Sequence, residues 1–169
     1  PGTFSRLVLL GPLVVLDESF QRRVAPRAHQ PRRTWSDREA LLEYLKGHDT
    51  ASRWRDDVIG DVVEHESLEL ADGSVDMKWA SESFNWEERK DDRYDLRPVL
   101  RSLGLPTLFI ASAARDHTFE ELRPVIDQTP GFQKLVVDNS DHNMYMERPD
   151  AVSWAITAFA AGEELPDRV

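Results

Sequence analysis

The sequence contains no cysteine among its 169 residues. This absence excludes a disulfide framework, catalysis by a thiolate and zinc sites that use cysteine ligands. His29, His48 and His65 lack the spacing of metal ligands, so we predict no metal ion and no cofactor. A chain without cysteine fits a reducing compartment, and we predict a cytoplasmic protein.

Basic residues are outnumbered by acidic ones, and long apolar runs are missing. The 21 Lys and Arg residues against 31 Asp and Glu residues give a formal net charge of −10, whereas non-specific nucleic-acid binding needs a basic face. No apolar run approaches the roughly 20 residues that span a bilayer. We therefore expect no nucleic acid and no membrane among the partners. Hydrophobic residues still make up 40% of the chain, enough for a buried core.

Three apolar runs have the length of buried strands, namely Arg6–Leu10, Pro106–Ser112 and Phe132–Val137. Their continuous hydrophobicity is typical of strands that are covered on both faces, as in parallel sheets. Helical patterns follow the second and third runs, and the last helix is expected to start at Pro149 and end at Gly162. Strands that alternate with helices predict a parallel sheet with right-handed crossovers.

A mostly helical insert separates the first strand from the second. The capping box Ser36–Glu39 predicts a helix to Lys46, and an apolar stripe predicts a second helix over 55–68. Val75–Trp79 alternates as a half-exposed strand would. Leu13–Leu16 could extend the first strand past the break at Pro12. The aromatic residues of the insert either pack a small helical layer or line an apolar pocket.

Two loops at the predicted carboxyl ends of strands carry groups suited to proton transfer. Asp116 follows the second strand, and His142 follows the third. A carboxylate bonded to one ring nitrogen of a histidine fixes its tautomer, and the other nitrogen can then take a proton from a nucleophile. Functional groups of such sheets gather beyond these strand ends. The alternative is a histidine exposed in a polar loop beside acidic residues.

The residues around these loops resemble one protein family. Leu105–Asp116 reads Leu-Pro-Thr-Leu-Phe-Ile-(x5)-Asp, and Asp141–Asp150 reads Asp-His-Asn-Met-x-Met-Glu-Arg-Pro-Asp, followed by an amphipathic helix. Together they resemble the C-terminal half of an α/β-hydrolase. The segment Arg6–Pro12 resembles the sixth strand of that fold, and the helical insert resembles its cap. The resemblance covers nearly the whole chain and is strongest from Pro106 to Phe159.

The resemblance implies a fold class and two roles. The fold is α/β, a partial α/β-hydrolase fold with three mostly parallel strands, flanking helices and a helical cap insertion. Residues 1–12 and 96–162 would form the C-terminal part of the hydrolase core, and residues 13–95 the cap. Asp116 matches the acid of the catalytic triad, and His142 matches its base.

The sequence departs from the family pattern at two loops and lacks one motif. Asp141 stands where the family often has glycine before the base, and Ala113 and Ala114 lie in a loop that often contains glycine. No Gly-x-Ser-x-Gly nucleophile elbow is present, and Ser5 and Ser19 lack the flanking glycines. The resemblance therefore implies that roughly a hundred residues with the nucleophile precede Pro1.

Three functional hypotheses follow. In the first, the chain is the C-terminal portion of a hydrolase that acts on a small apolar ester or a related small-molecule substrate. A serine nucleophile would make it an esterase, and an aspartate nucleophile would indicate epoxide or halide displacement. In the second, the chain is a non-catalytic subunit whose exposed edge at Arg6–Leu10 binds a separate N-terminal half or a second copy. In the third, the chain is a truncated remnant of a longer hydrolase.

Overall fold

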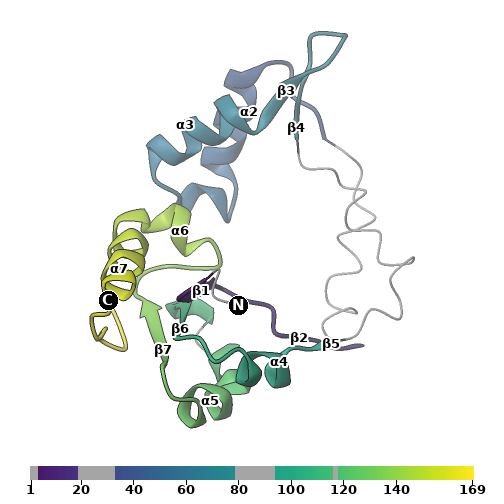
Figure 1. Ribbon diagram of the computed structural model, residues 1–169. Coiled ribbons are helices and arrows are strands. Elements are labelled where there is room, and N and C mark those ends of the chain that lie inside the picture. The colour runs from purple at the N-terminus through teal and green to yellow at the C-terminus, as the bar shows by residue number, and fades with distance from the viewer. Residues whose placement is uncertain (1–3, 19–32, 79–93, 116–117) are drawn as a thin grey trace. The chain divides into compact units, whose positions relative to one another are not determined.

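The computed structural model describes residues 4–18, 33–78, 94–115 and 118–169 (Figure 1). These residues belong to two compact units, each of which is described separately below. The first unit comprises Pro1–Val15 and Asp95–Val169, and the second comprises Leu16–Tyr94. No helix within the described residues is long and apolar enough to cross a membrane.

The first unit is built on a three-stranded parallel sheet, as the sequence predicted. Its strands are β1 (Leu7–Leu10), β6 (Thr107–Ser112) and β7 (Phe132–Val137), in the order β1-β6-β7. In the register, Leu7 is opposite Thr107, and Ser112 is opposite Val137. The strands β6 and β7 therefore end side by side, which places the loops that follow them next to each other.

Helices cover both faces of this sheet. Phe109 and Ala111 of β6 pack with α4 (Arg97–Ser102) and α5 (Thr118–Gln128) on one face. Leu108 and Ile110 pack with α6 (Met144–Glu147) and α7 (Pro149–Ala161) on the other face. All six residues of β6 are buried, which explains the continuous hydrophobicity of this strand. The last helix begins at Pro149 as predicted, and Gly162 ends it in the left-handed conformation, with φ at 85°.

The outer edge of β7 is covered by the last residues of the chain. The amide of Val136 donates to the carbonyl of Asp167 at 2.9 Å, and the amide of Val169 donates to the carbonyl of Val136 at 3.0 Å. A third bond of 2.6 Å joins the amide of Asp138 to the carbonyl of Val169. This segment, which we call the C-terminal tail (residues 167–169), extends the sheet by a short parallel bridge.

The second unit contains two α-helices, a short 3-10 helix and a short hairpin within its described residues. The elements are α2 (Arg38–Gly47), η1 (Ala51–Arg53), α3 (Asp56–His65), β3 (Ser67–Glu69) and β4 (Val75–Met77). The helix α2 starts one residue later than the predicted capping box requires. Its N-cap is Asp37, whose carboxylate accepts from the amide of Ala40 at 2.8 Å. The predicted cap at Ser36 is therefore wrong by one position, because the aspartate takes its place.

Other expectations from the sequence also need correction. The second helix ends at His65 rather than 68, and Leu68 belongs to β3. The strand β4 is buried along its whole length rather than half exposed, and it includes the buried Asp76. Leu13–Leu16 does not extend β1, because Gly11 turns the chain with a φ of 52°. Its last two residues form β2 (Val15–Leu16), which pairs with β5 (Tyr94–Asp95).

Candidate functional site

The candidate site lies where β6 and β7 end. A single 3-10 turn, η3 (Ala113–Arg115), follows β6, and the loop 138–143 follows β7. The two segments are joined directly, because the amide of Ala114 donates to the carbonyl of Ser140 at 3.3 Å. Polar groups of both segments therefore meet at the carboxyl edge of the sheet, where α/β proteins bind their ligands.

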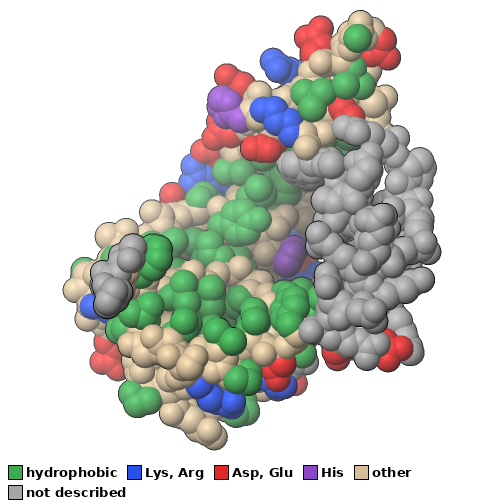
Figure 2. Space-filling model, turned by 45° about the vertical axis from the view of Figure 1, so that its right-hand side comes forward, with side chains coloured by type: hydrophobic (Ala, Val, Ile, Leu, Met, Phe, Trp, Pro, Cys, Tyr) green, Lys and Arg blue, Asp and Glu red, His purple; other side chains and the backbone are tan. Residues whose placement is uncertain are grey.

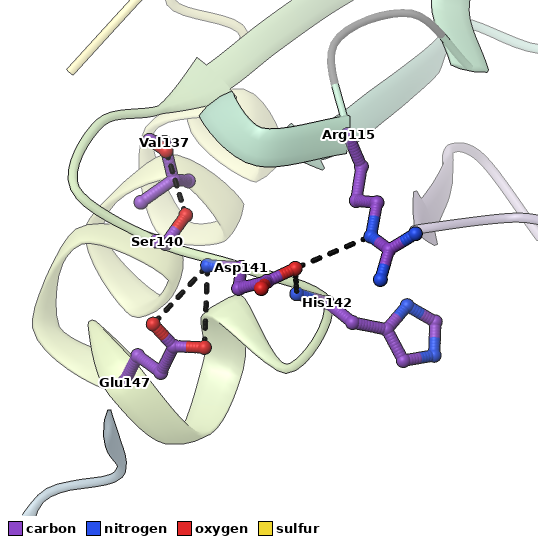
Figure 3. A network of polar contacts seen from close by, with 6 residues as sticks. All are labelled: Arg115, Val137, Ser140, Asp141, His142 and Glu147. Atoms are coloured by element: carbon purple, nitrogen blue, oxygen red, sulfur yellow. Dashed lines mark hydrogen bonds and ion pairs between the residues drawn. The ribbon is translucent and has the colours of Figure 1, made fainter. Parts of the chain in front are cut away.

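The two residues predicted to form the catalytic pair differ in what the structure describes. His142 is present on the loop after β7 (Figure 3). Its side chain is exposed. Asp116 and its neighbour His117 lie outside the described residues. His142 therefore lies in the loop that follows β7, while its role and its pairing with Asp116 stay predictions.

The backbone before His142 is held by a buried carboxylate. Glu147 is only 6% exposed, and its two oxygens accept from the amide of Asp141 at 3.1 and 3.2 Å. The amide of His142 donates to the Asp141 carboxylate at 2.7 Å, and Ser140 donates through its hydroxyl to the carbonyl of Val137 at 2.6 Å. His142 thus follows backbone amides and a carbonyl that are bonded within the same loop and to Glu147.

The loop reaches this conformation without glycine. Its residue in the left-handed region is Asn139, with a φ of 53°, and no other non-glycine residue described has a positive φ. Asparagine tolerates that region better than most residues. Asp141 does not need the backbone freedom of the glycine that the family often has there. Ala113 and Ala114 likewise fit into η3 with negative φ angles.

An ion pair that sequence reasoning missed crosses between the two loops. The Nε of Arg115 lies 3.2 Å from Oδ1 of Asp141 (Figure 3). Glu147 was also missed as a structural partner, although it belongs to the quoted motif. The only signal in the sequence was its position three residues after Met144, which puts both on the buried side of α6.

The described serines near the site do not have the environment of a nucleophile. Ser140 donates its hydroxyl proton to a backbone carbonyl. Ser112 ends β6, is fully buried, and its hydroxyl has no hydrogen-bond partner among the described residues. An activated serine needs a base within hydrogen-bond reach. Neither serine has such a base in the part of the chain that the structure describes.

Two carboxyl groups with lowered pKa values lie outside the two loops. The pKa of Asp57 is lowered to about 2 by its hydrogen bond with Arg55, and that of Asp95 is lowered to about 2 by its hydrogen bonds with Arg97. These aspartates stabilise local turns and helix starts. No group of three metal-binding side chains occurs within residues 4–18, 33–78, 94–115 and 118–169.

A groove of about 860 Å³ opens elsewhere on the first unit. It is lined by the turn between α5 and β7, which includes Gly131, and by residues before the C-terminal tail, such as Glu164. Phe132 also lines it and is the first residue of β7. The groove therefore lies at the end of the sheet opposite His142 and does not belong to the candidate site.

Comparisons with solved structures identify the fold. The chain is similar to E-2-(acetamidomethylene)succinate hydrolase, with 21% identity and a TM-score of 0.68 over 93% of this chain and 57% of that one. A peroxisomal α/β-hydrolase of Saccharomyces cerevisiae shares 14% identity, with a TM-score of 0.63 over 98% and 50% of the two chains. An esterase of M. tuberculosis shares 17% identity, with a TM-score of 0.62 over 93% and 54%.

These comparisons establish an α/β-hydrolase fold and a difference in length. The chain spans about half the length of the solved hydrolases that it matches. It therefore has part of that fold, as the resemblance in its sequence implied. No protein-family model matches the chain, and no curated protein matches it.

Proposed function

We propose that the chain is the C-terminal portion of an α/β-fold hydrolase, in which Asp116 and His142 act as triad acid and base on a nucleophile supplied by another segment. The observation that carries this proposal is the position of His142. It follows β7 at the carboxyl edge of a parallel sheet, beside the turn that follows β6 and immediately precedes Asp116 in the sequence. The α/β-hydrolase fold of the chain supports the same assignment.

With a serine nucleophile, the imidazole of His142 takes the hydroxyl proton as the serine attacks the substrate. The carboxylate of Asp116 holds the ring in the required tautomer and stabilises the imidazolium that forms. A serine nucleophile makes the assembled protein an esterase for small apolar esters. An aspartate nucleophile makes it an enzyme that opens epoxides or displaces halide. The aspartate then attacks as a carboxylate, and His142 takes a proton from the water that hydrolyses the resulting ester intermediate. Residues 13–95 are proposed to have the role of the cap.

The partner segment is proposed to bind at the free edge of β1. The amides of Leu7 and Gly11 donate to β6 or to the residue before it, at 3.0 and 2.8 Å. Alternation along a strand then directs the amides of Val8 and Leu10 to the other side. No described strand pairs with that side. A parallel strand from the N-terminal half of a hydrolase would satisfy these groups.

Exposed apolar side chains support a partner-binding site at the edge of β1. Figure 2 shows apolar side chains gathered over the part of the molecule where the first unit lies. All of the large, exposed apolar residues that the structure describes belong to this unit except Tyr94, and they include Phe4, Leu10 and Leu13, which flank or belong to β1. Leu10 is 38% exposed although it occupies a strand of a parallel sheet, a position that is normally covered.

The same edge supports a second candidate function. Two copies of the chain could pair through β1 around a two-fold axis, which would make the protein a non-catalytic assembly element. Light scattering at micromolar concentration distinguishes the alternatives. A stable homodimer that does not bind an N-terminal half favours the assembly element, and a heterodimer with that half favours the hydrolase.

The hydrolase proposal is tested by supplying the missing nucleophile. The coding sequence before Pro1 is read, and the segment it encodes is co-expressed with this chain and assayed with short-chain nitrophenyl esters. We expect hydrolysis, and we expect His142→Gln to lower kcat by about 1000-fold or more. The matched control is His65→Gln, because His65 is an exposed histidine of the second unit and its variant should retain full activity.

Two outcomes would contradict the proposal. In one, the His142→Gln variant keeps most of the activity of the unmodified assembly. In the other, a serine-reactive phosphonate labels this chain in the absence of any partner, which would show that the nucleophile lies within these 169 residues.

A further inference from the structure

The turn after β6 and the loop after β7 are joined by two neighbouring contacts. The amide of Ala114 donates to the carbonyl of Ser140 at 3.3 Å, and one residue further along each segment Arg115 pairs with Asp141 at 3.2 Å. The paired side chains are 26 residues apart in the sequence, so only the parallel pairing of β6 and β7 brings them together.

Asp141 is held from both sides of the loop. Its carboxylate accepts from Arg115 and from the amide of His142, the latter at 2.7 Å. Its own amide donates to the buried carboxylate of Glu147. Figure 3 shows the imidazole of His142 and the guanidinium of Arg115 on the same side of the loop, with Glu147 on the other side. A glycine at position 141 could make the backbone contact with Glu147 but neither of the side-chain contacts.

We propose that Asp141 and Arg115 are positioning residues for His142. Their ion pair fixes the backbone that carries the imidazole relative to the turn after β6, while Glu147 fixes it relative to α6. This inference rests on the proposed function, because it assigns a purpose to the placement of His142. The paired side chains are 50% and 35% exposed. The ion pair should therefore slow the separation of the two loops by a small factor and add little to the stability of the whole unit.

A second ion pair in the same unit provides the matched control. Arg168 pairs with Asp138 at 2.6 Å, with side-chain exposures of 49% and 41%. This pair resembles the first in exposure, but it joins the C-terminal tail to the residue after β7 rather than to the turn after β6. Neutralising it therefore removes a comparable charge without releasing the contact between the two loops.

The experiment measures the amide hydrogen exchange of Ala114 by NMR in the full chain. The variant Arg115→Gln removes the cation, and Asp141→Asn removes the charge while keeping an oxygen that can accept from His142. Each should speed the exchange of Ala114 by about 1.5- to 5-fold. The double variant should be no faster than the single ones, because both remove the same interaction. Arg168→Gln should leave the exchange of Ala114 unchanged.

A readout at His142 separates positioning from a general loss of structure. The order parameter of the His142 amide should fall in Arg115→Gln and recover in Arg115→Lys, which restores the positive charge and leaves Asp141 to accept from the His142 amide. Core amides such as Val125 should stay unaffected. Additive effects of the two single variants, or an unchanged order parameter at His142, would overturn the proposal. Neither measurement depends on activity, so the absence of hydrolysis in any assembly would contradict the proposed function alone.

Discussion

The two edges of the central sheet use their backbone groups differently. On the β7 edge, the amides of Val136 and Asp138 donate to carbonyls of the C-terminal tail. On the β1 edge, the amides of Val8 and Leu10 point away from β6, and no described strand receives them. Proteins usually protect edge strands against unwanted pairing. Among the described residues, the β7 edge of the sheet is therefore paired and the β1 edge is not, and β1 is the edge at which we propose that the partner binds.

The largest expected effect comes from truncating one leucine on each edge strand. Leu135 of β7 is fully buried, and Leu135→Ala should lower the free energy of unfolding of the first unit by about 2–5 kcal/mol. Leu10→Ala on β1 should cost less than about 1 kcal/mol in the isolated chain, because its side chain is already partly in water. Exchange of the Phe109 amide measures both values. Equal losses would show that the side chain of Leu10 is as well covered as that of Leu135.

Removing the C-terminal tail should convert the closed edge into an open one. Deleting residues 167–169 breaks three backbone hydrogen bonds, which together contribute about 1.5–4 kcal/mol. The variant should also associate at lower concentration than the intact chain, because β7 would then present unpaired groups. Urea unfolding and light scattering measure these effects.

The control for this deletion is Arg168→Gln, which removes the exposed ion pair with Asp138 and keeps the backbone of the C-terminal tail. It should change the stability by less than about 1 kcal/mol. If the substitution is as damaging as the deletion, the ion pair rather than the backbone pairing protects the edge.

The smallest effect is expected from a substitution in the first unit that lies away from both edges of the sheet. The side-chain and backbone hydrogen bonds of Arg97 hold the pKa of Asp95 at about 2. The stabilisation from this lowered pKa is fully present above the ordinary value of 3.8 and is lost as the pH falls through about 2. Arg97→Gln should move the pKa of Asp95 towards 3.8 in a carboxyl NMR titration. Exchange of the Val136 amide at pH 5 should not change, and a faster exchange would mean that the edge depends on this distant pair.

The sequence was sufficient for the elements that hydrophobicity alone determines. Phe132–Val137 was predicted with its observed bounds, and β6 was predicted within one residue, because a strand covered on both faces is a continuous apolar run. The same signal failed for β4, where the buried Asp76 gave a false alternation. The C-terminal tail carries no strand pattern, since its pairing depends on β7 rather than on its own residues.

The candidate site was predictable in its location but not in its supporting contacts. His142 could be placed at a strand end from the order of strands and helices, and the motif around it resembles the hydrolase family. The contact between Arg115 and Asp141 joins residues far apart in the sequence, so no local pattern indicates it. The left-handed conformation of Asn139 was not predicted either, because the family pattern has its glycine at position 141 rather than at position 139.

The exchange rates of four backbone amides test the central claim most directly. We predict that Val8 and Leu10 exchange near the rate of an unstructured peptide in the isolated chain, whereas Val136 and Asp138 are protected. Binding of the segment that supplies the nucleophile should slow Val8 and Leu10 by about 100-fold or more and leave the other two unchanged. Protection of Val8 and Leu10 in the isolated monomer, or their continued fast exchange in an active assembly, would contradict the account.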